Sequence, residues 1–225
     1  MLVQEWMTKE VVTITADISI MKAARLMKDK RVGRLPVVDE DGRIVGILTD
    51  RDIRSASPSK ATTLEMHELY YLLSELKTKD VMNKTPICAR ETDSVEGIAR
   101  LMMAKRIGGV PVVDDAKRVV GIITDSDIFK VLVDITGADR GGIQLAFEIP
   151  ATPGSLRPIL DGLRALNAGV ISVLTAQKGN SPETRRVYIR LRPLDEPLQT
   201  TVVESMKAGF PLVYWEPALK KDADA

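Results

Sequence analysis

The sequence predicts an α+β protein built from two copies of one unit, followed by a third and different unit. Residues Trp6–Ile53 align without a gap with Val81–Ile128, and 22 of the 48 aligned pairs are identical. Beyond about residue 142 the hydrophobic pattern changes to a single series of strands and helices. A repeat of this kind makes each copy one structural unit, so two copies predict a pair related by approximate two-fold symmetry.

The composition limits the kinds of partner. The chain has 225 residues, of which 44% are apolar and 28% charged, which is ordinary for a globular protein with a buried core. Its 32 basic and 31 acidic residues give a net charge of +1, and a near-neutral chain argues against nucleic acid as a partner. No stretch approaches the roughly 18 apolar residues of a membrane span, so we expect no membrane partner.

The single cysteine, Cys88, excludes an intramolecular disulfide and fits a reducing compartment. The first residues, "MLVQEWMTKE", lack the basic start and the apolar run of a signal peptide. We therefore expect a cytoplasmic protein.

Each copy predicts the element order β-α-β-β-α. A short β-rich segment comes first, "VVTIT" in copy one and "PICAR" in copy two. Apolar residues spaced i, i+3, i+4, i+7 then predict a helix, with Ser19 and Ser94 at the N-cap positions. Two strands follow, of which the first is opened by Pro36 or Pro111 and the second is rich in β-branched residues. The final helix begins at "DRDI" and at "DSDI".

One motif, Gly-Ile-x-Thr-x-x-Asp, joins the last strand to the last helix in each copy. Its threonine and aspartate are Thr49 and Asp52 in copy one, and Thr124 and Asp127 in copy two. The threonine lies where its hydroxyl and the free N–H groups of the helix start can hold an anion such as phosphate. The aspartate lies one helical turn further on the same side, and a carboxylate suits the paired hydroxyls of a ribose.

A structural interpretation competes with ligand binding, because Thr-x-x-Asp at a helix start also forms a capping box. A single copy would favour the cap. Two copies at matching positions, each preceded by Gly-x-x-Pro, favour a ligand site.

The repeat resembles a tandem pair of CBS domains (cystathionine-β-synthase domains, paired as a Bateman module). The likeness is carried by "MT-x-x-VVTI" and by "LPVVDEDGRIVGILTDRDI" with its second copy, and it covers about residues 1–135. The resemblance implies that the cleft between the copies binds an adenosine derivative such as AMP, ADP, ATP or S-adenosylmethionine.

The resemblance also implies roles for individual residues. Asp52 and Asp127 are expected to hold ribose hydroxyls, and Thr49 and Thr124 are expected to contact phosphate. The β-rich segments that line the base and the prolines that open the strands complete the expected nucleotide site: Val12, Thr13, Ile87, Cys88, Pro36 and Pro111.

The two copies differ in their arginines. Arg34 falls where CBS domains often place a basic residue facing phosphate, but copy two has Gly109 at that position. Arg51 likewise has Ser126 as its counterpart. Because the forked donors of arginine suit phosphate oxygens, we predict two unequal sites, with the more phosphorylated ligand at the site of copy one.

Residues 142–217 predict the ferredoxin-like order β-α-β-β-α-β, with Ser155 as the cap of its first helix. With "PATPGSL" after the first strand, this segment resembles an ACT domain, a fold that commonly binds amino acids at dimer interfaces. The resemblance places an amino-acid ligand near Gly154 and Ser155. An exposed sheet face explains the arginines of the third strand better than an anion site does: Arg185, Arg186, Arg190 and Arg192.

We place CBS domain one with a bridging helix at 1–78, CBS domain two at 79–138, the ACT-like domain at 142–217 and a flexible tail at 218–225. This layout resembles that of acetoin-utilisation proteins of the AcuB type. CBS pairs usually meet as discs and ACT domains usually share sheets or helices, so the resemblance implies a homodimer.

The sequence argues against an enzyme. A single histidine, His67, and a single cysteine cannot supply a catalytic triad, and no Gly-x-x-x-x-Gly-Lys or Gly-x-Gly-x-x-Gly loop is present. Asp50 and Asp52 carry carboxylates that can ligate a metal ion, but ribose binding and helix capping explain the pair better, so we predict no metal site. We predict a sensor that regulates an unidentified protein and requires no cofactor. The alternative is a structural scaffold or oligomerisation module with vestigial ligand sites.

Overall fold

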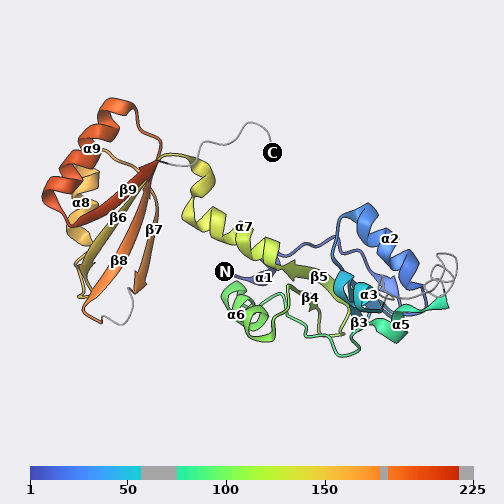
Figure 1. The fold of residues 1–225 in the computed structure, drawn as a ribbon. Helices are drawn as coiled ribbons and strands as arrows, with labels where there is room; N and C mark the ends of the chain where they lie inside the picture. The colour runs from blue at the N-terminus through green and yellow to red at the C-terminus, as the bar shows by residue number, and fades with distance from the viewer. Residues whose placement is uncertain (57–74, 178–181, 218–225) are drawn as a thin grey trace. The chain divides into compact units, whose positions relative to one another are not determined.

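The computed structural model describes residues 1–56, 75–177 and 182–217. The bridging helix predicted between the copies, His67 and the predicted tail lie outside the described residues. The chain forms two compact units, Met1–Phe129 and Lys130–Ala225 (Figure 1). The division between them falls within helix α7 (Asp125–Thr136), whereas the sequence-based boundary was placed after residue 138.

The first unit contains both repeats. Strands β2 and β3 pair antiparallel in repeat one, and β4 and β5 do so in repeat two with the equivalent register. The elements of repeat one are β1 (Ile14–Thr15), α2 (Ile20–Lys30), β2 (Arg34–Val38), β3 (Ile44–Thr49) and α3 (Asp50–Ala56). Those of repeat two are α6 (Val95–Lys105), β4 (Gly109–Val113), β5 (Val119–Thr124) and α7.

The predicted helix caps are confirmed. The side chain of Ser19 accepts a hydrogen bond from the N–H of Lys22 over 3.4 Å, and that of Ser94 accepts one from the N–H of Gly97 over 3.0 Å. Each bond satisfies one of the free N–H groups at the start of α2 or α6.

The first strand of copy two is shorter than the sequence predicted. Segment "VVTIT" forms β1, which pairs with β2, but "PICAR" makes only an isolated bridge between Ala89 and Val112. The N–H of the next residue, Arg90, donates to the carboxylate of Asp93 over 2.8 Å. This side-chain bond ends the pairing one residue after the bridge.

The segment at the start of each repeat packs on the opposite repeat. The N–H and carbonyl groups of Thr8 exchange hydrogen bonds of 2.9 Å with those of Ile122 in β5. Asn83 and Ile47 in β3 do the same, also over 2.9 Å. The short helices α1 (Val3–Trp6) and α5 (Thr78–Val81) lie in these two exchanged segments.

The glycine of the repeated motif makes room for these segments. A Cβ atom on Gly46 would lie under 3.0 Å from the Sδ atom of Met82, and one on Gly121 would lie under 3.0 Å from that of Met7. Each motif glycine therefore leaves space for a methionine of the exchanged segment.

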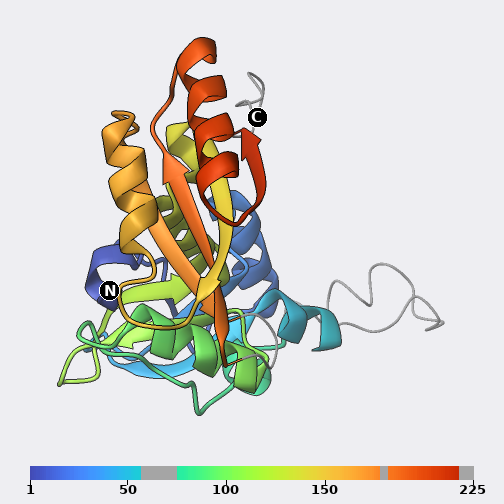
Figure 2. The same cartoon turned by 90° about the vertical axis from the view of Figure 1, so that its left-hand side faces the viewer.

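The second unit is a four-stranded antiparallel sheet in the order β7-β8-β6-β9, with two helices over one face (Figure 1). Figure 2 shows these helices side by side over the strands. Its elements are β6 (Ile143–Pro150), α8 (Arg157–Ala165), β7 (Val170–Gln177), β8 (Thr184–Leu191), α9 (Glu196–Gly209) and β9 (Leu212–Pro217), preceded by a 3-10 turn at Ala138–Arg140. The predicted β-α-β-β-α-β order is confirmed, and the core lies between the sheet and the helices.

Two sequence predictions in this unit are wrong. The cap position of α8 is Leu156, and the hydroxyl of Ser155 instead lies 2.7 Å from the carbonyl oxygen of Pro150 and 2.9 Å from that of Thr152. The sheet face that carries Arg190 is also not exposed at that residue, since Arg190 retains only 7% of its accessible surface.

Candidate ligand site in the paired repeats

The repeated motif forms a compact hydrogen-bonded loop at the start of α3. The hydroxyl of Thr49 donates to Oδ2 of Asp52 over 2.6 Å, and the N–H of Thr49 donates to the same oxygen over 2.8 Å. The N–H of Asp52 in turn donates to the Thr49 hydroxyl over 3.2 Å. These bonds are those of the capping box that competed with the ligand interpretation. They engage Oδ2 only, and no other described residue donates to Oδ1 of Asp52.

The second copy repeats this loop at the start of α7. The hydroxyl of Thr124 donates to Oδ2 of Asp127 over 2.7 Å, and its N–H donates over 3.0 Å. Asp127 is 3% exposed, and it makes a further polar interaction. The two aspartates thus share their local geometry but differ in burial, because Asp52 is only partly buried.

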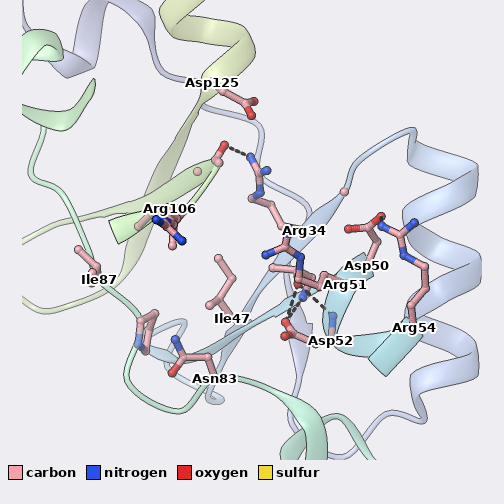
Figure 3. A pocket seen from close by; sticks show the side chains of 16 residues that line it. Arg34, Ile47, Asp50, Arg51, Asp52, Arg54, Asn83, Ile87, Arg106 and Asp125 are labelled. Carbon is pink, nitrogen blue, oxygen red and sulfur yellow. Dashed lines mark hydrogen bonds and ion pairs between the residues drawn. The ribbon is translucent and has the colours of Figure 1, made fainter. Parts of the chain in front are cut away.

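A pocket of about 530 Å³ lies in the first unit and is lined by both repeats (Figure 3). This volume is within the range of small-molecule sites in proteins. Repeat one contributes Gly33, Arg34, Ile47, Thr49, Asp50, Arg51, Asp52 and Arg54, and the remainder of the wall is Asn83, Pro86, Ile87, Arg106, Ile107, Gly108, Gly109 and Asp125.

The pocket wall holds more cationic than anionic side chains, four arginines against three aspartates. Arg54 is paired with Asp50, with 2.5 Å between Nη2 and Oδ2. No described residue forms an ion pair or a side-chain hydrogen bond with Arg51 or Arg106. These two guanidinium groups are therefore available to an anion in the pocket.

Arg34 crosses from one repeat to the other. It opens β2, but its Nη1 atom donates to the carbonyl oxygen of Gly108 in repeat two (Figure 3). The side chain therefore lies at the junction of the two repeats, on the side of the pocket where Asp125 begins α7.

Five of the residues singled out in the sequence line this pocket: Arg34, Thr49, Arg51, Asp52 and Ile87. Ile87 reaches it because its segment is the one exchanged onto repeat one. The others are not part of its wall: Val12, Thr13, Pro36, Cys88, Pro111, Thr124 and Asp127.

The structure shows what surrounds three of these residues, Pro36, Pro111 and Cys88. Pro36 and Pro111 lie in the strands opposite Ile47 and Ile122. Cys88 is half-buried, and its Sγ atom lies 3.6 Å from the carbonyl oxygen of Pro86. Burial raises the pKa of the Cys88 thiol above its ordinary value, and the charge of nearby Lys117 opposes this shift only in part.

Sequence reasoning missed several residues of the wall, above all Arg106. This residue ends α6 in the left-handed conformation with φ 54°, as Arg31 ends α2 with φ 53°. The signal was present in the repeat, since "KRVG" and "KRIG" occupy matching positions. Nothing in a single copy shows that this arginine turns toward the site of the other copy.

Within residues 1–56, 75–177 and 182–217 no group of three histidine, cysteine, aspartate or glutamate side chains has the arrangement of a metal site. In the same residues no helix has both the length and the apolar character required to cross a membrane.

Comparison with known proteins places the repeats among named relatives. The chain is 37% identical over 130 residues to L-aspartate semialdehyde sulfurtransferase of Methanocaldococcus jannaschii, which is 58% of this chain but only 23% of that enzyme. It therefore spans less than a quarter of that relative. A CBS domain-containing protein of Dictyostelium discoideum is 33% identical over 134 residues, and 92% of its length is covered.

Solved structures show the same fold. The CBS domain pair of protein MJ0100, in complex with 5′-methylthioadenosine and S-adenosylmethionine, is 35% identical with a TM-score of 0.50, covering 59% of this chain and 95% of that one. CBSX2 in complex with AMP is 27% identical with a TM-score of 0.50, covering 60% and 97%. The acetoin-utilisation protein AcuB of Vibrio cholerae is 25% identical with a TM-score of 0.52, covering 62% and 95%.

The model of the CBS domain matches residues 3–59 and 79–134, which together are just over half of the chain. The two matches cover the two repeats, including the exchanged segments at their starts. The chain belongs to the CBS-domain family.

Proposed function

We propose that this protein is a regulatory sensor that binds a phosphate-bearing adenosine derivative in the pocket beside Thr49 and Asp52. One observation carries the proposal: a pocket lined by both repeats holds a carboxylate oxygen of Asp52 and the guanidinium groups of Arg51 and Arg106, and none of these has a hydrogen-bond or ion-pair partner among the described residues. The complex of a similar CBS pair with 5′-methylthioadenosine and S-adenosylmethionine supports an adenosine ligand, and the complex of CBSX2 with AMP supports one that carries phosphate.

The chemistry of the wall suggests how such a ligand is oriented. Oδ1 of Asp52 accepts the ribose hydroxyls, since an ionised carboxylate accepts hydrogen bonds at both oxygens. The base lies against the apolar side chains of Ile47 and Ile87. The phosphate is held by Arg51 and Arg106, whose guanidinium groups have no protein partner among the described residues.

We propose a second, weaker site at Thr124 and Asp127, lined by Val12 and Thr13. Thr8 of the same segment pairs with Ile122, two residues before Thr124. Copy two places Ser126 where copy one has Arg51, so this site has less affinity for phosphate.

The competing function is a scaffold with vestigial sites. It is favoured by the hydrogen bonds between Thr49 and Asp52, which satisfy a helix start without any ligand. We propose no enzymatic activity for the chain, because the enzymes among its relatives are matched over only a small part of their length.

Mass spectrometry of small molecules released from the purified protein, followed by calorimetry with AMP, ATP and S-adenosylmethionine, distinguishes sensor from scaffold. Asp52→Asn keeps an acceptor for Thr49 but removes the charge at the ribose, and we expect about a ten- to a hundredfold loss of affinity. Asp29→Asn is the control, because Asp29 is exposed on α2 and outside the pocket. Absence of binding to the unaltered protein supports the scaffold, and turnover of ATP supports an enzyme.

We also propose a homodimer. The edge strand β9 exposes apolar side chains that a partner can cover, with Val213 48% and Trp215 42% exposed. Light scattering of a protein of 24.7 kDa per chain tests this, and a mass near that of one chain at micromolar concentration contradicts it.

For the second unit we propose ACT-type binding of an amino acid at the loop between β6 and α8. Gly154 has φ 82°, and a Cβ atom there would meet nothing within 4 Å. Nη2 of Arg185 donates to the hydroxyl of Ser155 over 3.3 Å, which places a cation beside this loop. Differential scanning fluorimetry with the amino acids one by one tests the proposal, and no shift in melting temperature with any of them contradicts it.

A further inference from the structure

Arg34 and Gly109 occupy matching positions in the two repeats, yet they meet each other in the folded chain. The guanidinium of Arg34 lies over the start of β4, where Nη1 donates to the carbonyl oxygen of Gly108. Figure 3 shows this side chain directed to the strand of repeat two.

Glycine at two consecutive positions makes this placement possible. A Cβ atom on Gly109 would lie under 3.0 Å from both Nη1 and Cδ of Arg34. A Cβ atom on Gly108 would lie 2.7 Å from Nη2 of Arg34 and 2.8 Å from Oδ2 of Asp125. Neither glycine has a positive φ, so the backbone does not demand glycine there and its role is to leave space.

In this position the guanidinium is already engaged by repeat two. It has a carbonyl acceptor at Gly108, and the carboxylate of Asp125 lies against the same glycine. A phosphate in the pocket must compete with the carbonyl oxygen of Gly108 for Arg34. A ligand without phosphate has no such competition.

We infer that Gly109 is a specificity-determining residue: it leaves space for Arg34 across the junction of the repeats and so lowers the affinity of the pocket for phosphate. This inference rests on the proposed nucleotide site. A side chain at position 109 excludes Arg34 from its place on repeat two and makes its guanidinium available to the phosphate of AMP or ATP. Affinity for 5′-methylthioadenosine, which carries no phosphate, is unaffected by the position of Arg34.

The test is calorimetry of Gly109→Ala with AMP and with 5′-methylthioadenosine. We expect AMP to bind about tenfold more tightly, as for the release of one hydrogen bond to a charged group, and 5′-methylthioadenosine to bind as before. In the background of Arg34→Ala, Gly109→Ala is expected to have no effect on AMP. Gly108→Ala provides a second route to the same displacement, should Gly109→Ala fail to fold.

Gly33→Ala is the matched control. Gly33 is the counterpart of Gly108 in repeat one and also lines the pocket, but a Cβ atom there meets nothing within 4 Å. The added methyl group leaves Arg34 in place, so the ratio of the affinities for AMP and 5′-methylthioadenosine should not change.

Three outcomes overturn the inference: an unchanged AMP affinity in Gly109→Ala and Gly108→Ala, an equal change for both ligands, or a gain that persists without Arg34. Pyrophosphate, used as a probe in the same variants, separates this inference from the nucleotide site. If no adenosine derivative binds but pyrophosphate binds more tightly in Gly109→Ala, the proposed function fails and the role of Gly109 stands. If neither class of ligand binds any variant, both fail.

Discussion

The hydroxyl of Thr49 and the carboxylate of Asp52 are joined by a hydrogen bond of 2.6 Å that uses only Oδ2 of the carboxylate. The pair therefore caps a helix and leaves the other carboxylate oxygen, Oδ1, without a donor among the described residues. The two interpretations of the motif, cap and ligand site, are compatible in one geometry.

Thr49→Val tests the structural half of this pair, because it removes the hydroxyl and keeps the branched shape. We expect the free energy of unfolding to fall by about 1 kcal/mol, as for the loss of a helix cap. Thr49→Ser, which keeps the hydroxyl, should retain most of this stability. Urea denaturation measures both, and equal losses in the two variants would assign the effect to packing of the methyl group.

Arg51→Ala tests the inequality of the two sites, because copy two has Ser126 at this position. We expect a phosphate-bearing nucleotide to bind the site beside Asp52 about ten- to a hundredfold more weakly, with binding at the second site unchanged. Arg25→Ala, an exposed arginine of α2, is the control. If AMP and ATP bind both sites with equal affinity in the unaltered protein and in Arg51→Ala, the difference between the repeats has no effect on binding.

Arg190 in the second unit carries a buried charge with few partners. Its Nη2 donates to Oε1 of Gln144 over 3.1 Å, while Nε and Nη1 are buried without a partner among the described residues. Arg190→Met keeps much of the volume and removes these donors, so we expect the free energy of unfolding to stay equal or to rise by about 1–3 kcal/mol. Arg190→Ala should lower it through lost packing.

Thermal or chemical denaturation of Arg190→Met and Arg190→Ala measures these changes in the free energy of unfolding. Equal destabilisation by methionine and alanine would show that the guanidinium itself stabilises the unit, and that it has an acceptor which the described contacts do not include.

Cys88 should react slowly in the folded protein. Burial raises the pKa of its thiol, so a smaller fraction is thiolate at any pH below that value than in the unfolded chain. We expect the rate of alkylation by iodoacetamide to rise at higher pH in the native protein than in urea, as followed by mass spectrometry. Coincident pH profiles in the two states would contradict this.

The local elements could be predicted from the sequence because their signals are local. Helices α2 and α6 follow from the spacing of apolar residues and from Ser19 and Ser94. In the second unit the signals are equally local, since apolar residues alternate along β6 and β8 and Pro197 lies in the first turn of α9, where proline is tolerated.

The pocket could be predicted only in part, because its walls come from segments far apart in the chain. Thr49 and Asp52 can be identified from their motif. Asn83 reaches the pocket through the exchange of segments and Arg106 from the end of α6 in repeat two, and neither arrangement leaves a periodic pattern. The sequence also could not show that Arg34 extends to Gly108. A basic residue at the start of a strand has the same local pattern whether its side chain faces a ligand or the other repeat.

The exchanged segments have a consequence for how such a chain could arise. In a single repeat, the first segment would have no strand of another repeat to pair with. A single repeat would therefore need a second identical molecule with which to exchange this segment. Fusion of two copies in one chain replaces association between two molecules by association within one molecule. It also permits a difference that two identical molecules cannot have: within one polypeptide, arginine at position 34 can face glycine at its mirror position, 109. Two unfused copies would bring arginine against arginine, or glycine against glycine, at their common axis.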